Sequence, residues 1–254
     1  MWKPGLFLLL AVPVLTNNQC RSCDPATETE TEVSTETDPP APCEGYVAQA
    51  SEEALAGTPR ARTEIEQLAI TLGTGLTADP EIYERLVMDL EAIWDLTEAV
   101  DGVTYLPPHD GRSLLLGVDA TTQAAIDDGT YTAWDCANEA YGLDTVQVSS
   151  SYVRVSFDGI YDLDLLAEEY ADLPGIDFAE PDYLVGDGDT VCVTPEPAAW
   201  NYVMVVGWGD CPSGCIHRHY HHYATEAPGD AARYSDWSSE DGGDEPMWVR
   251  IYGC

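Results

Sequence analysis

Lysine is almost absent from this chain of 254 residues, in which Lys3 is the single example. Basic side chains number 10 in all, whereas 46 are acidic, so the formal net charge at neutral pH is -36. A nucleic-acid-binding protein needs a basic patch that displaces counterions from phosphates, and anionic lipid heads make a similar demand. The few arginines are scattered, so the charge excludes nucleic acid as a partner. The acidic residues run through the whole chain, which favours a role in solubility over a single binding site.

Familiar signatures of catalytic sites are missing as well. The chain has no G-x-S-x-G, H-E-x-x-H, P-loop or S-x-x-K motif. Its 46 acidic residues offer many carboxylate pairs, so a carboxylate-pair hydrolase stays open. We expect a protein without enzymatic activity, with catalysis as the alternative. No cofactor is predicted, apart from Zn²⁺ or Ca²⁺ at the sites described below.

Long apolar runs are missing, except for a short one at the N-terminus. Lys3 and Pro4 precede a mostly apolar stretch over residues 5–15, which is typical of a secretory signal peptide. The stretch is too short to span a membrane. We therefore assign residues 1–19 to a signal peptide, and we expect an exported chain with no transmembrane segment after its removal.

A segment rich in Thr, Glu and Pro follows at residues 20–50. Such a composition cannot bury enough apolar surface to fold, and it looks like the polar tether of a bacterial surface lipoprotein. Cys20 stands where a lipid anchor would be attached, although residues 17–19 (NNQ) do not match the usual lipobox. Free secretion and lipid anchoring at a bacterial surface are the two alternatives. Residues 51–254 are predicted to form one globular domain, with a sub-boundary near residues 185–195.

Helical and strand patterns follow one another along that domain. Apolar residues recur at helical spacing over residues 62–72 and again after Asp79 and Pro80, which supply a helix start. We place the acidic residues of this second helix, Asp89 among them, on its solvent side. Further helices are expected at residues 121–126 and 163–173, strands at 103–106, 113–118, 146–149, 152–157, 176–178, 202–206, 216–223 and 247–252, and a loop at 225–246.

This order of elements predicts an α+β fold. It would begin with N-terminal helices, continue as a mixed α/β sandwich and end in a C-terminal antiparallel β-hairpin region.

Eight cysteines in an exported chain predict disulfide bonds, because the compartment is oxidising. They are Cys20, Cys23, Cys43, Cys136, Cys192, Cys211, Cys215 and Cys254. Residues 212–214 (PSG) can turn the chain sharply, so we predict a Cys211–Cys215 bond. A Cys23–Cys43 bond would close a loop in the tether. Cys254 is expected to pair with Cys136 or with Cys192, a choice that the sequence leaves open.

Four of the five histidines lie in residues 217–222, which read HRHYHH. On a β-strand His217, His219 and His221 would point to one face. Three imidazoles can share a Zn²⁺ ion, with water or a fourth protein ligand completing the set. Asp210 is a candidate for that fourth ligand. The sequence thus predicts a metal site, and a metal-dependent hydrolase is one functional alternative.

A structural role for the same strand is the other interpretation. The strand would then be an exposed aromatic face in which His219 is hydrogen-bonded and Arg218 pairs with one of the many carboxylates. Residues 186–190 (GDGDT) resemble a Ca²⁺ loop, but they lack the later bidentate glutamate of an EF-hand.

Residues 166–182 read LAEEYADLPGIDFAEPD. This run resembles the end of subtilase pro-domains, which close with a helix and a Pro-Gly-Val turn into an edge strand ending in Glu-Pro-Asn/Asp. The resemblance implies a small ferredoxin-like α/β sandwich that chaperones or inhibits a serine protease. Pro174 and Gly175 would stop the helix, and Ile176 and Phe178 would face the core. An ordinary helix–turn–strand unit is the alternative, and no subtilase catalytic domain follows.

Residues 207–219 read GWGDCPSGCIHRH. They resemble a block, GDCPxGCIxRH, of secreted bacterial proteins of uncharacterised function, with Asp210, Arg218 and His219 at matching positions. That group implies no activity, and its spacing implies a hairpin whose loop is locked by a disulfide. We therefore expect an exported, disulfide-stabilised, non-enzymatic protein of unknown partner. A protease-inhibitor or pro-domain-like module is the second hypothesis.

Overall fold

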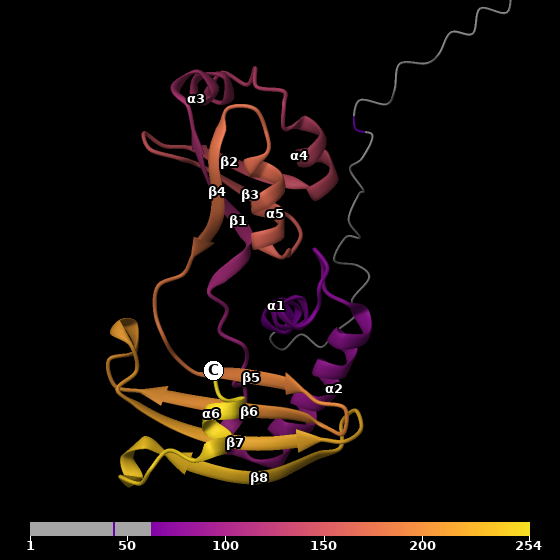
Figure 1. The fold of residues 1–254 in the computed structure, drawn as a ribbon, viewed down its shortest axis with the longest axis vertical. Helices are drawn as coiled ribbons and strands as arrows, with labels where there is room; N and C mark the ends of the chain where they lie inside the picture. Colours follow the sequence, from indigo (N-terminus) through magenta and orange to yellow (C-terminus); the bar gives the residue numbers. More distant parts are fainter. Residues whose placement is uncertain (1–42, 44–61) are drawn as a thin grey trace, which may run out of the picture. The chain divides into compact units, whose positions relative to one another are not determined.

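Helices and two antiparallel sheets make up the part of the chain that the computed structural model describes, Cys43 and residues 62–254 (Figure 1). The predicted α+β class is confirmed. These described residues belong to one compact unit. The predicted signal peptide and most of the predicted tether, with Cys20 and Cys23, lie outside the described residues. Among the helices within those limits, none combines the length and the apolar character that a membrane crossing requires.

Helices α1 (Arg62–Leu72) and α2 (Pro80–Leu96) lie where the apolar spacing predicts them. Asp79 caps α2, since its Oδ1 accepts a hydrogen bond from the backbone N–H of Glu81 at 2.8 Å. Pro80 takes the first helical position, where a missing N–H costs no hydrogen bond. Local rules of helix initiation therefore account for the start of α2.

The first sheet has four strands in the order β2-β3-β1-β4. Their bounds are β1 His109–Val118, β2 Leu143–Val148, β3 Val153–Phe157 and β4 Ile176–Tyr183. All neighbours are antiparallel, and Leu114 of β1 stands opposite Val155 on one side and Pro181 on the other. Among the described strands β4 pairs only with β1, so it forms an edge of this sheet.

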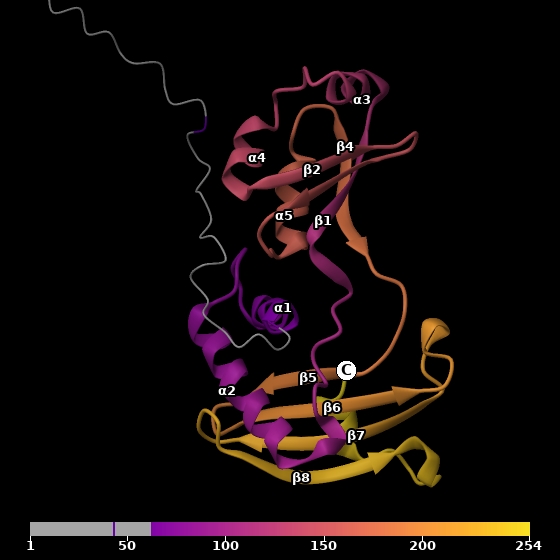
Figure 2. The same ribbon diagram turned by 180° about the vertical axis from the view of Figure 1, so that it is seen from behind.

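Three helices accompany the first sheet. They are α3 Ala120–Asp127, α4 Asp135–Tyr141 and α5 Leu163–Ala171. With α3 and α4 together at the first helical position, the chain order is the β-α-β-β-α-β arrangement called ferredoxin-like. Figures 1 and 2 show α4 and α5 on the same side of the sheet. We name residues 109–183 the inserted lobe.

The second sheet also has four antiparallel strands, in the order β5-β6-β7-β8. Their bounds are β5 Thr190–Pro195, β6 Trp200–Trp208, β7 His217–Thr225 and β8 Ala231–Ser238. Figures 1 and 2, drawn from opposite sides, show α2 on one face of this sheet and α6 (Met247–Tyr252) on the other. The second sheet is therefore covered on both faces.

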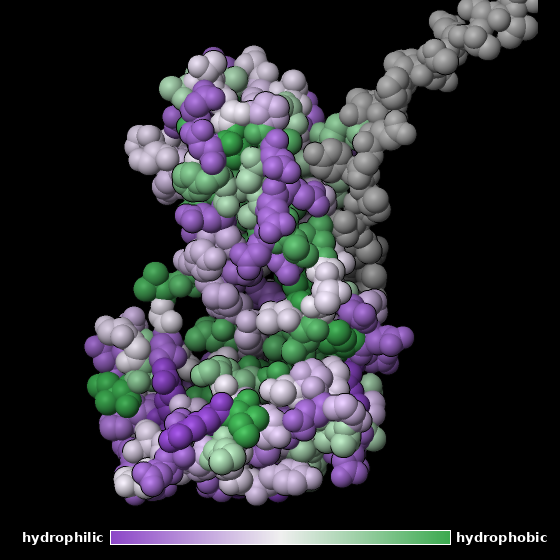
Figure 3. Space-filling view, viewed as in Figure 1, coloured by the Kyte–Doolittle hydropathy of each residue, from purple (hydrophilic) through white to green (hydrophobic). Residues whose placement is uncertain are grey.

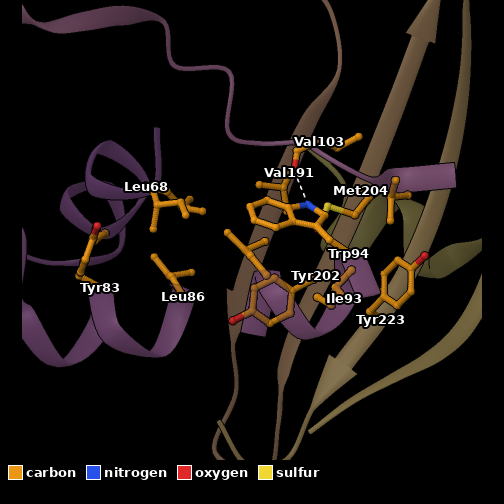
Figure 4. Packing of buried hydrophobic residues seen from close by; sticks show 14 of the residues in the cluster. Leu68, Tyr83, Leu86, Ile93, Trp94, Val103, Val191, Tyr202, Met204 and Tyr223 are labelled. Carbon is orange, nitrogen blue, oxygen red and sulfur yellow. Dashed lines mark hydrogen bonds between the residues drawn. The ribbon is translucent and has the colours of Figure 1, made fainter. Parts of the chain in front are cut away.

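Helices α1 and α2 share their core mainly with the second sheet, and Ile160 of the inserted lobe joins the same cluster. Figure 4 shows Trp94 and Ile93 of α2 against Tyr202, Met204 and Tyr223 of β6 and β7. The inserted lobe has a core of its own. Outside that core, Figure 3 shows hydrophobic residues, coloured green, around the position of α1. The lobe thus interrupts one α-β unit between α2 and β5, which explains its name.

The indole of Trp94 illustrates how this core accommodates polar atoms. Its Nε1–H donates to the carbonyl oxygen of Val103 at 2.9 Å, in a fully buried bond (Figure 4). A buried indole N–H without a partner would carry a desolvation cost. The bond also fixes the chain just after α2, where it turns toward the inserted lobe.

Several strand predictions are wrong. Residues 247–252 form α6, because Trp248 and Tyr252, four positions apart, can both stack on His222 only from a helix. The predicted loop at 225–246 contains β8, a largely exposed edge strand whose polar sequence hides its pairing with β7. No strand forms at residues 103–106.

The prediction for Phe178 is wrong as well. A register shift between Gly117 and Val118 of β1 changes the alternation along β4, so Ile176 is buried while Phe178 stays 47% exposed. The phenyl ring covers Gly117, where a side chain would collide with it. A bulge of this kind breaks the two-residue period on which the prediction rested.

Candidate functional site

The histidine strand β7 lies inside the second sheet, between β6 and β8. Its alternation places His217, His219 and His221 on the face of Tyr223, which packs toward α2. His222 lies on the opposite face, under α6. The predicted shared face is therefore present, and the surroundings of each ring decide what it can do.

His219 and His221 form a close pair. Their ring centroids are 4.1 Å apart with the planes tilted by 30°. The side chain of His219 reaches Asp236 of β8, with 3.5 Å between Nε2 and Oδ2. His221 is only 3% exposed, and its Nδ1 has no hydrogen-bond partner among the described residues. Burial, followed by the nearby His219 and Arg233, lowers the pKa of His221 to about 4.

His217 stands apart from this pair. Its ring stacks on Trp208 with the centroids 5.6 Å apart, and its Nδ1 lies 3.5 Å from a carboxylate oxygen of Glu240. The structure thus brings together His219 and His221, while His217 has its own partners. Across Cys43 and residues 62–254, no three His, Cys, Asp or Glu side chains are grouped so as to hold a metal ion.

Arg218 is paired with Asp187, the carboxylate that precedes β5. The backbone N–H of Cys215 donates to Asp187 Oδ2 at 2.9 Å, and that of Gly188 donates to Oδ1 at 2.8 Å. The hydrogen bond from Cys215 is the main cause that lowers the pKa of Asp187. A further bond joins the Asp187 N–H to the Cys211 carbonyl at 3.0 Å. The segment before β5 is thereby fixed to the Cys211–Cys215 loop.

The predicted Ca²⁺ loop coincides with this arrangement. Asp189 Oδ1 accepts the backbone N–H of Gly207 at 2.8 Å, so both acidic residues of the GDGDT run bond to neighbouring backbone. Asp210 opens the short 3₁₀ turn Cys211–Ser213, and its carbonyl accepts the N–H of Ser213 at 3.0 Å. These residues connect β5, β6 and β7 at one end of the sheet.

Three disulfides are present among the described cysteines. Cys211 is bonded to Cys215, Cys192 to Cys254 and Cys43 to Cys136. The expectation of a Cys23–Cys43 bond is therefore wrong. Cys192 lies in β5, so its bond fixes the C-terminus that follows α6.

A buried carboxylate, Asp89 of α2, is the polar site that the sequence analysis missed. It was placed on the solvent side of its helix, yet it is fully buried. Its Oδ2 accepts from Tyr202 at 2.7 Å, from Thr225 at 2.6 Å and from Arg85 at 2.6 Å. Its Oδ1 accepts the N–H of Gly229 at 2.7 Å. Position 89 lies three residues after Leu86 and four before Ile93 on the helix, so the sequence does place it beside the apolar stripe.

Edge strand β4 continues into an exposed apolar segment. Tyr183 and Leu184 are each 55% exposed, and Val185 is 96% exposed. The backbone N–H of Leu184 donates to the carbonyl of Pro108 at 2.7 Å, and Asp187 is held at the other end by the Cys211–Cys215 loop. Residues 185–186 lie between these two anchors, so the exposed Val185 belongs to a segment that is hydrogen-bonded at both ends.

Comparison with protein-family models, with curated proteins and with solved structures finds no match to this chain.

Proposed function

We propose that this chain is an exported, disulfide-stabilised protein that acts by binding another protein, and that the inserted lobe binds and inhibits a serine protease of the subtilisin type. One observation carries the proposal. The lobe has the ferredoxin-like β-α-β-β-α-β order, and its edge strand β4 runs directly into the exposed residues 183–185. The residues that resemble the end of a subtilase pro-domain, 166–182, form α5, the turn and β4 of this lobe.

An edge strand suits this role because half of its backbone groups are free to pair with a partner. A protein can add its own strand to such an edge, with main-chain hydrogen bonds giving affinity and side-chain pockets giving specificity. Beyond β4, Val185 is exposed enough to enter a pocket of the partner. A protease that binds its substrates in extended form would receive residues 183–185 in this way.

The two fixed ends of residues 184–187 favour inhibition of the protease over cleavage of this segment. Leu184 is held by Pro108, and Asp187 is held by Cys215 and Arg218. A segment that is already ordered loses less conformational entropy on binding, so more of its contact energy appears as affinity. The same anchors would keep the two ends of a cut segment in place.

The first test is a titration of a subtilisin-type protease with the disulfide-bonded protein, measured as the hydrolysis rate of a peptide substrate. We expect inhibition that saturates at an equimolar ratio. Val185→Asp should raise the inhibition constant by about 10- to 100-fold, as for the loss of a central interface side chain. The added charge lies on a fully accessible residue, so the fold should be unaffected.

Met247→Asp is the matched control, because Met247 is an apolar side chain that is 75% exposed in α6, outside the inserted lobe. It should inhibit like the unchanged protein. Equal inhibition constants for the two variants would contradict a role for residues 183–185. Rapid degradation of the protein with no inhibition would overturn the proposal itself.

Export and lipid attachment make a separate prediction. When the full chain is expressed in a bacterium, we expect removal of residues 1–19 and a lipid-modified Cys20, which mass spectrometry of the membrane fraction would detect. Cys20→Ser should then move the protein into the medium. A mature chain that is free of lipid and already in the medium would support secretion without an anchor.

A further inference from the structure

A cavity of about 240 Å³ lies where α1, the segment before β1 and the start of α5 meet. Gln67 of α1 forms one wall and bonds across to the inserted lobe, with its Nε2 donating to the carbonyl of His109 at 3.0 Å. Nearby, the N–H of Asp162 donates to the carbonyl of Leu76 at 2.9 Å. Pockets for drug-sized ligands begin at roughly 300 Å³, so this cavity fits a smaller molecule.

The charge of the cavity is negative. Asp162 and Asp164 line it, and the described residues around it include no lysine or arginine. Asp162 caps α5 by accepting the N–H groups of Asp164 and Leu165, each at 3.1 Å. This cap offsets the partial positive charge, about +0.5, of the helix N-terminus. Asp164, an exposed residue in the first turn of α5, is the second carboxylate of the lining and can attract a cation.

Aromatic rings supply the rest of the lining. Tyr105 and Tyr161 border the cavity together with His109. Burial lowers the pKa of His109, against the opposing effect of Asp164, so its ring is uncharged at neutral pH and does not repel a cation. The His109 Nδ1 accepts the N–H of Gly111 at 3.2 Å. Aromatic rings beside a carboxylate are a suitable environment for an organic ammonium group.

We infer that this cavity binds a small organic cation of the quaternary-ammonium class. The volume of the cavity suits a molecule of few atoms. Asp164 supplies the negative charge, and the aromatic residues of the lining would contact the methyl groups of the ammonium ion. Pro107 and Pro108 add apolar surface without competing donors. The cavity adjoins residues 183–185, since Pro108 accepts the N–H of Leu184 and His109 pairs with Tyr183, but the inference does not depend on the proposed inhibition of a protease.

Choline and its uncharged carbon isostere, 3,3-dimethylbutan-1-ol, provide the test. Both are titrated into the disulfide-bonded protein while chemical shifts of residues around the cavity are followed by NMR. Choline should bind at least about tenfold more tightly, and the shifts should include His109 and Tyr105. Asp164→Asn, which keeps the shape of the side chain, should weaken choline binding by about 5- to 20-fold, while Asp164→Glu should keep most of it.

Asp177→Asn is the matched control, because it removes one carboxylate from an exposed position of β4. It changes the net charge equally, so attraction by overall charge alone would weaken choline binding to the same degree in both variants. That result would overturn the inference. Equal affinities for choline and the uncharged isostere, or shifts scattered over the surface, would overturn it too.

Discussion

Replacing Asp89 with alanine is expected to lower the free energy of unfolding by about 3–5 kcal/mol, the usual effect of removing one partner from a buried ion pair. The carboxylate accepts hydrogen bonds from Arg85, Tyr202 and Thr225, together with the backbone of Gly229. Without it, a largely buried guanidinium loses its counter-charge. Urea unfolding, followed by tryptophan fluorescence, measures the change.

Glu91→Ala on the same helix is the control, since Glu91 is exposed. Its effect should stay within about 0.5 kcal/mol, as is usual for surface positions. A loss below about 1 kcal/mol for Asp89→Ala would show that the buried network contributes little. Asp89→Asn should fall between the two, because an amide can keep some of the hydrogen bonds but cannot balance the charge of Arg85.

The elements that the sequence predicted correctly depend on neighbours in the chain. Asp79 and Pro80 start α2 by local hydrogen bonding, and the apolar spacing of α5 follows from its own turns. The alternation of β7 likewise predicted that His219 and His221 share a face. Each of these features can be derived from a few consecutive residues.

The features that the sequence did not predict depend on distant partners. Asp89 belongs to the buried side of α2 only because Tyr202 and Thr225 come from strands more than a hundred positions away. Insertion of a whole lobe between α2 and β5 separates these groups along the chain. Likewise α6 packs as a helix because His222 lies beneath it. Tertiary packing overrides local propensity in each case.

Of the three histidines that the sequence places on one face, only His219 and His221 lie together in the structure. Side chains of the neighbouring strands decide which imidazoles meet. Trp208 of β6 stacks on His217, and Asp236 of β8 lies beside His219. The alternation of a strand determines on which face of the sheet a side chain lies, but not which side chains of other strands lie next to it. The chemistry of this site is consequently that of a buried neutral imidazole, and acid should disturb it.

Acidification should destabilise the protein through His221. Burial, with contributions from His219 and Arg233 and against Asp236, lowers its folded-state pKa to about 4, whereas an unfolded histidine has a pKa of about 6.5. Between these values the unfolded state binds more protons than the folded state, so stability falls as the pH falls. The stability is fully present above pH 6.5, and its loss from this one residue by pH 4 should be about 3 kcal/mol.

His221→Gln removes the titration of His221. Comparison of the variant with the unchanged protein therefore separates the contribution of His221 from that of the many carboxylates, which both proteins share. The difference in unfolding free energy between the unchanged protein and the variant should shift by about 3 kcal/mol between pH 7 and pH 4 in favour of the variant. Urea unfolding at a series of pH values measures this difference. His217→Gln is the control, because it removes an imidazole that is 39% exposed and lies outside the pair. Parallel curves for His221→Gln would mean that the buried imidazole protonates without cost, contrary to its lack of a hydrogen-bond partner at Nδ1 among the described residues.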